Sequence, residues 1–147
     1  MPSFTVRTPA RGSCQAMFEA ALSTKLHVGS MARHEERARA AKSVLGLHDE
    51  VALTARHFGR TWRMTSRIVE LIPNRSFVDE QTSGPFKRFR HTHTFVALGH
   101  GCEMTDHITY QAPVGVIGAV VERLVLTRYL RNLITQRGHY LASVAGG

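Results

Sequence analysis

Two histidines and two aspartates stand out as residues that can do chemistry. His91 and His93 lie two positions apart in a run that alternates polar and apolar side chains, and Asp79 and Asp106 lie in similar runs before and after it. Side chains two positions apart on a β-strand point to the same face of the sheet. A histidine held by a carboxylate is a suitable general acid or base near neutral pH. The spacing therefore predicts four candidate catalytic residues on one face.

The same face is predicted to carry two more polar side chains among large apolar ones. Gln81 shares the phase of Asp79, and Tyr110 shares the phase of Asp106. A tyrosine beside a histidine–carboxylate pair can polarise a carbonyl, as aldol-type cyclisation or dehydration requires. The candidate ligand-binding residues are Trp62, Met64, Phe77, Asp79, Gln81, Phe89, His91, His93, Phe95, Met104, Asp106 and Tyr110.

Two other interpretations of the polar cluster stay open. It can be a buried hydrogen-bond network that satisfies itself and fixes the register of the strands. It can also be a metal site, because histidines at i and i+2 of a strand converge on one ion, but this needs a third ligand at bonding distance. We expect no metal and no cofactor. The chain has no phosphate-cradling glycine loop, CxxC pair or nucleophile elbow, and so nucleotide-dependent and serine- or cysteine-nucleophile chemistry lack support.

Five stretches of alternating side chains are predicted to position these residues. Two of them flank Gly59-Arg60 and form a hairpin, and two more flank the turn at Gly99–Gly101 and form another. His107 has the opposite phase to Asp106 and is expected to face solvent. The predicted strands are residues 50–58, 61–72, 75–82, 86–98 and 102–111. Because they follow one another directly, the sequence predicts an antiparallel meander that must curve.

The first half of the chain is expected to add a strand, a helix and a connection. A short strand at residues 3–7 should end at Pro9, which has no ladder donor. A helix over residues 13–23 follows, with Ser13 as its N-cap. The segment at residues 23–47 has helix-forming residues but few apolar ones. We expect an irregular, partly helical connection there, over the open side of the sheet.

A long helix is predicted at the end, over residues 116–141, after Pro113 and Gly115. Its length of roughly 39 Å, at about 1.5 Å per residue, is enough to follow the sheet. Gly118 should allow a close approach or a kink, and Gly138 should begin the fraying of the helix. Its apolar residues fall on two sides, which are Ile117, Val120, Val121 and Leu124, and Leu126, Leu130, Leu133 and Ile134. The helix is therefore expected to bend or to be covered on both sides.

The length favours one domain spanning residues 1–147, and the order of the predicted elements makes it α+β. With 43% hydrophobic and 20% charged residues, the composition is ordinary for a globular protein. The net charge of +8 is carried by scattered arginines, and so we expect a solvated face and no nucleic-acid partner. No apolar run is long enough to span a membrane and no secretory signal begins the chain, which predicts a cytoplasmic protein. Cys14 and Cys102 lie in different predicted elements, and we expect no disulfide between them.

One string of residues resembles a known family. FVDEQTSGPFKRFRHTHTF, from Phe77, is followed by G-x-x-M-T-D-x-I-x-Y-x-x-P-x-G-x-x-G, from Gly101 to Gly118, and the whole is similar to the START-like superfamily. This superfamily is also called SRPBCC or polyketide cyclase/dehydrase-like. The resemblance implies a helix-grip fold, in which a curved antiparallel sheet wraps around a long C-terminal helix with a hydrophobic cavity between them. It implies no metal, and no catalytic residue is carried over because members do not share them.

The sequence leads to three hypotheses about function. The first is binding of a hydrophobic small molecule, such as a lipid, polyketide or aromatic compound, in a cavity between sheet and C-terminal helix. The second is a cofactor-independent cyclase or dehydratase that uses a histidine–aspartate pair of the cavity as general acid and base. The third is an interaction module, in which the second apolar face of the terminal helix packs against another subunit, giving a homodimer.

Overall fold

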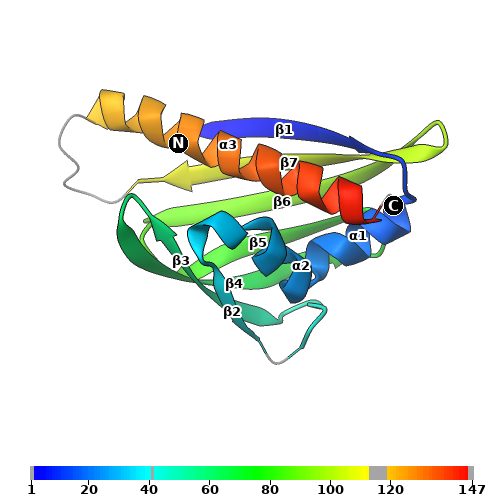
Figure 1. Cartoon of the computed structure of the whole chain (residues 1–147), viewed down its shortest axis with the longest axis horizontal. Helices are drawn as coiled ribbons and strands as arrows, with labels where there is room; N and C mark the ends of the chain where they lie inside the picture. Colours follow the sequence, from blue (N-terminus) through cyan, green and yellow to red (C-terminus); the bar gives the residue numbers. More distant parts are fainter. Residues whose placement is uncertain (1, 41, 113–118, 146–147) are drawn as a thin grey trace.

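One curved antiparallel sheet carries three helices on a single face (Figure 1). The computed structural model describes residues 2–40, 42–112 and 119–145, and the side chains of all of these except Arg33 and residues 119–123. The order of the seven described strands across the sheet is β1-β7-β6-β5-β4-β3-β2. The elements are β1 (Ser3–Ala10), α1 (Cys14–Leu22), α2 (Thr24–Ser30), a 3-10 turn η1 (Ala32–His34), β2 (Arg37–Ala40), β3 (Glu50–His57), β4 (Arg60–Ile72), β5 (Ser76–Ser83), β6 (Arg88–Leu98), β7 (Gly101–Gln111) and α3 (Ala119–Ala145). The predicted α+β helix-grip fold is confirmed.

The two predicted hairpins are present, and the side-chain phase of the central strands is as expected. Strand β6 pairs with β7 so that His93 lies opposite Asp106 and Phe95 opposite Met104. His91 and His93 are buried, whereas His107 is exposed and its ring meets the hydroxyl of Thr5 at 2.9 Å. The alternation of side chains therefore predicted the inward-facing residues correctly, because helices cover one face of the sheet and solvent contacts the other.

Strand β1 is longer than predicted and continues through Pro9 to Ala10. Strand β1 lies at one edge of the sheet. Proline is tolerated in an edge strand, because an N–H that is missing on the unpaired side breaks no hydrogen bond to a neighbouring strand. The only strand partner of β1 among the described residues is β7, with Ala10 opposite Cys102. This long-range pairing places the first strand of the sequence beside a strand that begins at Gly101.

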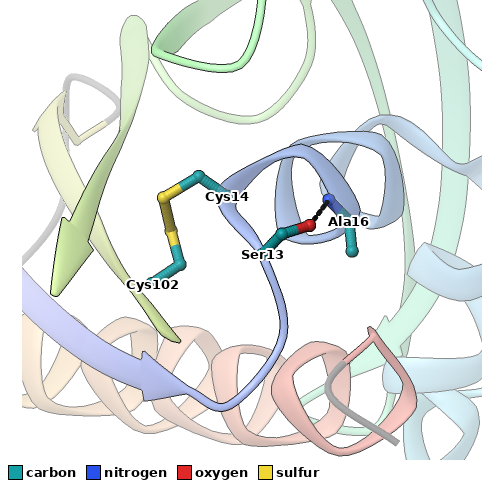
Figure 2. Close-up of a disulfide and its surroundings, with 4 residues drawn as sticks. All are labelled: Ser13, Cys14, Ala16 and Cys102. Atoms are coloured by element: carbon teal, nitrogen blue, oxygen red, sulfur yellow. Dashed lines mark hydrogen bonds between the residues drawn. A yellow bond between two sulfur atoms is a disulfide. The ribbon is translucent and has the colours of Figure 1, made fainter. Parts of the chain in front are cut away.

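The expectation of unpaired cysteines was wrong, because Cys14 and Cys102 form a disulfide (Figure 2). Ala10 lies opposite Cys102, and α1 begins with Cys14 directly after the turn that follows Ala10. The Cα atoms of the two cysteines are 5.0 Å apart although 88 positions separate them in sequence. The bond fastens the start of α1 to the start of β7. Local patterns could not show this, since it depends on the pairing of β1 with β7.

Helix α1 has the predicted cap and the predicted buried stripe. Ser13 Oγ accepts a hydrogen bond from the Ala16 amide at 3.1 Å, as Figure 2 shows. Met17 and Phe18 are buried, and the Phe18 ring meets the edges of Phe77 and Phe95 at centroid distances of 5.7 and 5.5 Å. Edge-to-face contacts of this kind add to the burial of apolar area. Helix α1 therefore seals the sheet near β5 and β6.

The segment at residues 23–47 is more ordered than predicted. It holds α2, η1 and the edge strand β2, whose residues Arg37–Ala40 pair with β3. The sequence there is RARA, in which arginine and alanine carry no β preference and no apolar alternation. Pairing with β3 therefore decides the conformation, and the expectation of an irregular, partly helical connection missed this strand.

Helix α3 lies along β1 and β7 and runs to Ala145, beyond the predicted end (Figure 1). Gly138 does not begin the fraying of the helix; it allows close approach, because a Cβ there would lie 2.3 Å from Oγ1 of the buried Thr8. Leu124 is exposed, whereas the side made by Leu126, Leu130, Leu133 and Ile134 packs on β1 and β7. The predictions for Pro113, Gly115, the helix start at 116, Ile117 and Gly118, and for the side chains of Val120 and Val121, lie outside the described residues. Within the described residues, no helix has the length and apolar character to cross a membrane.

Candidate functional site

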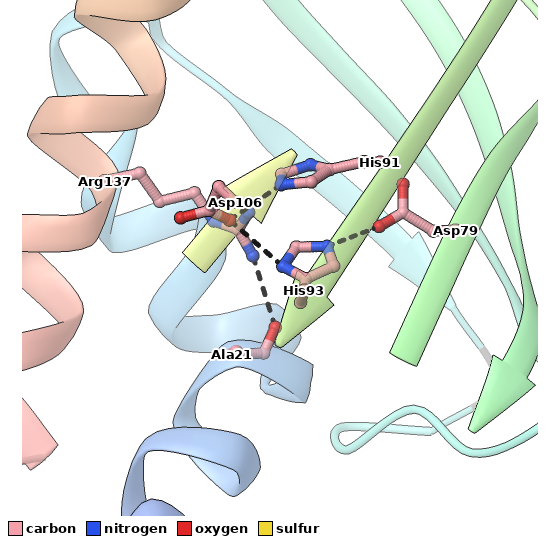
Figure 3. Close-up of polar contacts among 6 residues, drawn as sticks. All are labelled: Ala21, Asp79, His91, His93, Asp106 and Arg137. Carbon is pink, nitrogen blue, oxygen red and sulfur yellow. Dashed lines mark hydrogen bonds and ion pairs between the residues drawn. The ribbon is translucent and has the colours of Figure 1, made fainter. Parts of the chain in front are cut away.

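The four predicted polar residues meet in one buried network, which we call the aspartate–histidine network (Asp79, His91, His93 and Asp106). His93 Nε2 lies 2.7 Å from Asp79 Oδ2, and His91 Nε2 lies 2.7 Å from Asp106 Oδ1 (Figure 3). His93 Nδ1 is 3.2 Å from the same Asp106 oxygen, which links the two pairs. Strands β5, β6 and β7 supply these residues from neighbouring positions, with Asp79 opposite His91 and His93 opposite Asp106.

A stack of three rings fixes the orientation of the imidazoles. The His91 and His93 rings are stacked with centroids 3.7 Å apart, and Phe77 stacks on the other face of His93 at 4.0 Å. His93 is therefore held between two rings and between two carboxylates. Its side chain is 1% exposed, whereas that of Asp79 is 19% exposed, so His93 is the enclosed member of this pair and Asp79 the accessible one.

The pKa values of the two histidines of the network are shifted in opposite directions. Burial and the neighbouring His93 lower the pKa of His91 from its ordinary 6.5 to about 4, against the opposing effect of Asp106. Burial also disfavours charge on His93, but Asp106 and Asp79 together outweigh it and raise the pKa of that ring. The hydrogen bonds from the histidines keep the pKa of both aspartates below the ordinary value despite burial. His91 is thus neutral near pH 7, whereas the two carboxylates that flank His93 favour its protonated form.

Arg137 of α3 completes the charge balance. It is buried, lies close enough to lower the pKa of Asp79, and donates from Nη2 to the Ala21 carbonyl at 3.3 Å (Figure 3). The two buried carboxylates therefore have hydrogen bonds from the histidines and the positive charge of Arg137 nearby, which is how buried charges are tolerated. Arg137 was not predicted, because only the apolar positions of the helix were assigned to its two faces. The signal was there, since Leu126, Leu130 and Leu133 continue to Arg137 at helical spacing.

A cavity of about 850 Å³ lies between the sheet and the helices, and the network forms part of its wall. The predicted ligand-binding residues that line it are Trp62, Met64, Phe77, Asp79, Phe89, His91 and Tyr110. Most of its remaining wall is apolar and comes from β3, β4, α1, α2 and α3, including Leu53, Ile68, Leu126, Leu130 and Leu133. The second nitrogen of His91 points away from Asp106 (Figure 3). His91 and Asp79 therefore present hydrogen-bonding groups to an apolar space.

Five predicted ligand-binding residues are not among the described residues that line the cavity: Gln81, His93, Phe95, Met104 and Asp106. His93 and Asp106 lie behind His91 and Asp79 and orient them. Phe95 and Met104 belong to the core beneath α1. Gln81 instead closes the β5–β6 connection, because its amide donates to the Phe86 carbonyl at 2.7 Å and accepts from the Phe86 amide at 3.2 Å.

Tyr110 lines the cavity next to the helix. Its ring is fully buried, and its hydroxyl is hydrogen-bonded to Oγ1 of Thr127 on α3. The phenol therefore ties β7 to α3.

A further set of polar residues lies in the cavity wall and was not predicted from the sequence. We call this set the second polar group (His27, Glu36, His57 and Tyr129). His27 Nε2 lies 2.8 Å from Glu36 Oε1, and His57 Nδ1 lies 2.7 Å from the Tyr129 hydroxyl. The phase of His57, two positions after Ala55 and four after Leu53, was a readable signal. His27 and Glu36 lie in the segment at residues 23–47, where strand β2 was not predicted, and no local pattern marks them.

Asp79, His91 and His93 also offer atoms with the reach of a metal site, since one ligand atom of each lies within 4.8 Å of the others. His93 uses Nε2 on Asp79 and His91 uses Nε2 on Asp106. An ion bound through these atoms must break the hydrogen bonds that balance the network. The absence of a metal stays a prediction.

Comparisons with known proteins agree with this architecture. The structure is similar to TTHA0849 from Thermus thermophilus, with a TM-score of 0.85 at 14% identity over 98% of this chain and 97% of that one. It is similar to the ZhuI aromatase/cyclase from Streptomyces sp. R1128, with a TM-score of 0.77 at 13% identity over 98% and 93%. A third similar structure is ginseng major latex-like protein 151 from Panax ginseng, with a TM-score of 0.61 at 14% identity over 89% and 95%. At such identities the likeness shows the fold alone.

Sequence comparison gives the family. No curated protein matches the sequence. Residues 23–136, which include the network and both sides of the cavity, match the family described as polyketide cyclase/dehydrase and lipid transport. The resemblance to the START-like superfamily is confirmed, and the chain belongs to the polyketide cyclase/dehydrase and lipid transport family.

Proposed function

We propose that the chain, working as one domain over residues 1–147, encloses a hydrophobic small molecule between the sheet and α3. The observation that carries this proposal is the cavity of about 850 Å³, whose wall is apolar except for a few fixed polar groups. This volume is in the range of small-molecule pockets, roughly 300–1,000 Å³. Lipids, polyketides and other extended aromatic compounds fit such a space. Asp79 and His91 supply polar contacts at one end.

A thermal-shift screen of lipids and aromatic polyketides, combined with native mass spectrometry, tests the proposal. A ligand at 100 times its Kd stabilises the folded state by about 2.7 kcal/mol, which raises Tm by several degrees. Ala55→Leu fills part of the cavity wall and should reduce the shift, whereas Ala97→Leu on exposed β6 should not. If no compound of these classes raises Tm or adds mass to the wild-type protein, the binding function is overturned.

A second candidate function is cofactor-independent cyclisation or dehydration, favoured by the arrangement of His91. The ring is neutral, Asp106 holds its Nε2, and the other nitrogen is left with the lone pair that a general base needs. His93 has both nitrogens facing aspartates and cannot serve in this way. Asp79, at the cavity wall, is the nearest further group that can orient a substrate.

The variant His91→Gln tests this second function, because an amide at that position keeps a donor for Asp106 but is no base. With a linear poly-β-ketone thioester as substrate, wild-type protein should give cyclised or dehydrated product, and His91→Gln should give at least about 100-fold less, the usual size of a general-base contribution. Unchanged Tm would show that the network is intact. Product formation at wild-type rate by His91→Gln would exclude His91 as the base.

The disulfide bears on the cellular compartment in which the protein binds its ligand. Cytosolic proteins seldom keep disulfides, whereas the sequence predicts a cytoplasmic location. Alkylation of thiols in intact cells, followed by mass spectrometry of the peptide that contains Cys14, distinguishes the bonded from the reduced form. The cytoplasmic location, the homodimer and the absence of a nucleic-acid partner stay predictions.

A further inference from the structure

The second polar group lies in the same cavity as the aspartate–histidine network but far from it. His57 is paired with Arg60 and Asp79 with Ile68, and both partners lie on β4. Eight positions separate Arg60 from Ile68, which is roughly 26 Å at about 3.3 Å per residue along a strand. Trp62 and Met64 line the cavity between these two points. The cavity therefore has polar groups toward both ends and an apolar middle.

The four residues of the second polar group converge from separate elements. His27 comes from α2, Glu36 from the residue before β2, His57 from the end of β3 and Tyr129 from α3. The Glu36 side chain is 7% exposed, and its Oε1, although 2.8 Å from His27 Nε2, has no hydrogen bond of good geometry. A buried carboxylate oxygen without a well-formed hydrogen bond is costly. It is available to a donor that enters the cavity.

The chemistry of this group selects the kind of ligand atom that it can bind. Burial raises the pKa of Tyr129, so its phenol remains a donor. Burial and His34 lower the pKa of His57, against the effect of Glu36, so that ring is neutral. A carboxylate on the ligand would meet Glu36 in a poorly solvated place and be repelled. A hydroxyl can donate to Glu36 and accept from Tyr129 or His57.

We propose that the second polar group binds the hydroxyl at one end of an elongated ligand whose other polar end meets Asp79 and His91. The inference rests on the proposed binding function and narrows the ligand class to long or flat apolar molecules with a hydrogen-bonding group at each end. Of the two ends, a hydroxyl rather than a carboxylate lies beside Glu36.

Two matched probes long enough to reach both polar groups test the proposal, 1,16-hexadecanediol and 1-hexadecanol, which differ by one terminal hydroxyl. Trp62 is the single tryptophan of the chain and lines the middle of the cavity, so its fluorescence reports the Kd of each probe directly. Wild-type protein should bind the diol about fivefold more tightly than the mono-alcohol, as expected for one net hydrogen bond. Tyr129→Phe and Glu36→Gln should bring this ratio close to one.

Tyr140→Phe is the matched control, because it removes the same hydroxyl from the same helix at a residue that is not among the described lining. It should keep the wild-type ratio. Equal affinity of wild-type protein for the two probes, or an unchanged ratio in both Tyr129→Phe and Glu36→Gln, overturns the second binding site while leaving the cavity as a binder of apolar molecules. Failure of both probes to bind, together with a negative ligand screen, overturns the proposed function itself.

Discussion

The aspartate–histidine network and the second polar group contain the same kinds of side chains but are built differently. The network is supplied by three neighbouring strands, and the side chains of His91, His93 and Asp106 are at most 5% exposed. In the second polar group three elements and the residue before β2 give one residue each, and the His27 side chain is 22% exposed. The sheet holds the first arrangement rigidly, whereas the second depends on how α2 and α3 sit over the sheet.

This difference separates two roles that polar residues play in one cavity. In the network each charge has a fixed partner, so a change in one residue leaves another charge buried and unpaired. In the second polar group the pairs are joined by single contacts, so a change should alter ligand contacts more than the fold. The first arrangement is therefore expected to dominate stability and the second to dominate discrimination between ligands.

The largest expected effect is that of Asp106→Ala. It removes the carboxylate shared by His91 and His93, and loss of one partner of a buried pair costs roughly 3–5 kcal/mol. Urea unfolding followed by circular dichroism measures it. Glu103→Ala on the same strand, with its side chain on the outer face, is the control and should change the free energy of unfolding little. A loss below about 1 kcal/mol for Asp106→Ala would contradict the view that the network holds the sheet together.

Removal of the disulfide should come next and sharpens the comparison, because it frees the helix that closes the network. Ala21 of α1 accepts the hydrogen bond of Arg137, and Cys14 anchors the same helix. The double variant Cys14→Ser/Cys102→Ser should lose about 2–4 kcal/mol, as is typical when a bond closing a long loop is removed. The measurement is the urea midpoint with and without dithiothreitol. Reductant should shift the midpoint of the wild-type protein and leave that of the double variant unchanged.

The pH dependence of stability should separate the two histidines of the network. Between the ordinary pKa of 6.5 and about 4 the unfolded chain protonates His91 and the folded chain does not, so stability falls as pH falls. His93 has a raised pKa, and its contribution is complete below pH 6.5 and is lost as pH rises through the folded value. In a plot of the free energy of unfolding against pH, His91 thus gives an acid limb and His93 an alkaline limb. Each limb has a slope of at most about 1.4 kcal/mol per pH unit.

Thermal unfolding between pH 4 and pH 9 measures these limbs. His91→Gln should flatten the acid limb relative to wild type, and His93→Gln should flatten the alkaline limb at a lower overall stability. Tyr129→Phe, in the second polar group, should leave both limbs in place. A His91→Gln profile parallel to that of the wild type would show that His91 does not resist protonation in the folded state.

The smallest expected effect on stability is that of Tyr129→Phe. It removes one hydrogen bond to His57 but keeps the ring contact with Phe58, whose centroid lies 4.4 Å away. The expected loss is about 0.5–1.5 kcal/mol, measured by urea unfolding, with Tyr140→Phe as the comparison. A loss as large as that of Asp106→Ala would erase the distinction between the two groups.

The central strands were predictable because their signal is local. Alternation along residues 86–98 and 102–111 is enough to place His91, His93 and Asp106 inward, since a shift of one residue would expose them all. The helix-grip fold, by contrast, rested on the family resemblance as well as on the order of elements. What the phase could not show is depth, and so His93 and Asp106 were expected at the cavity surface although they lie behind it.

Arg137 and His57 carried a periodic signal that was overlooked, whereas the other features that escaped prediction depend on contacts distant in sequence. The disulfide follows from the pairing of β1 with β7, and β2 follows from its pairing with β3. Glu36 enters the cavity only because β2 adopts that pairing. Gly138 reads as a helix end in the sequence, but its reason is the nearby Thr8.

The two edge strands of the sheet, β1 and β2, affect how two copies of the chain can associate. One margin, β1, contains Pro9, which has no N–H to offer an incoming strand, and the other, β2, is four residues long and exposes Arg37 and Arg39. A second molecule that approached β2 edge to edge would bring like charges together, and one that approached β1 would miss a bond. Both edges of the sheet therefore disfavour growth by strand addition, and a pairing of two copies is expected to use surfaces other than these edges.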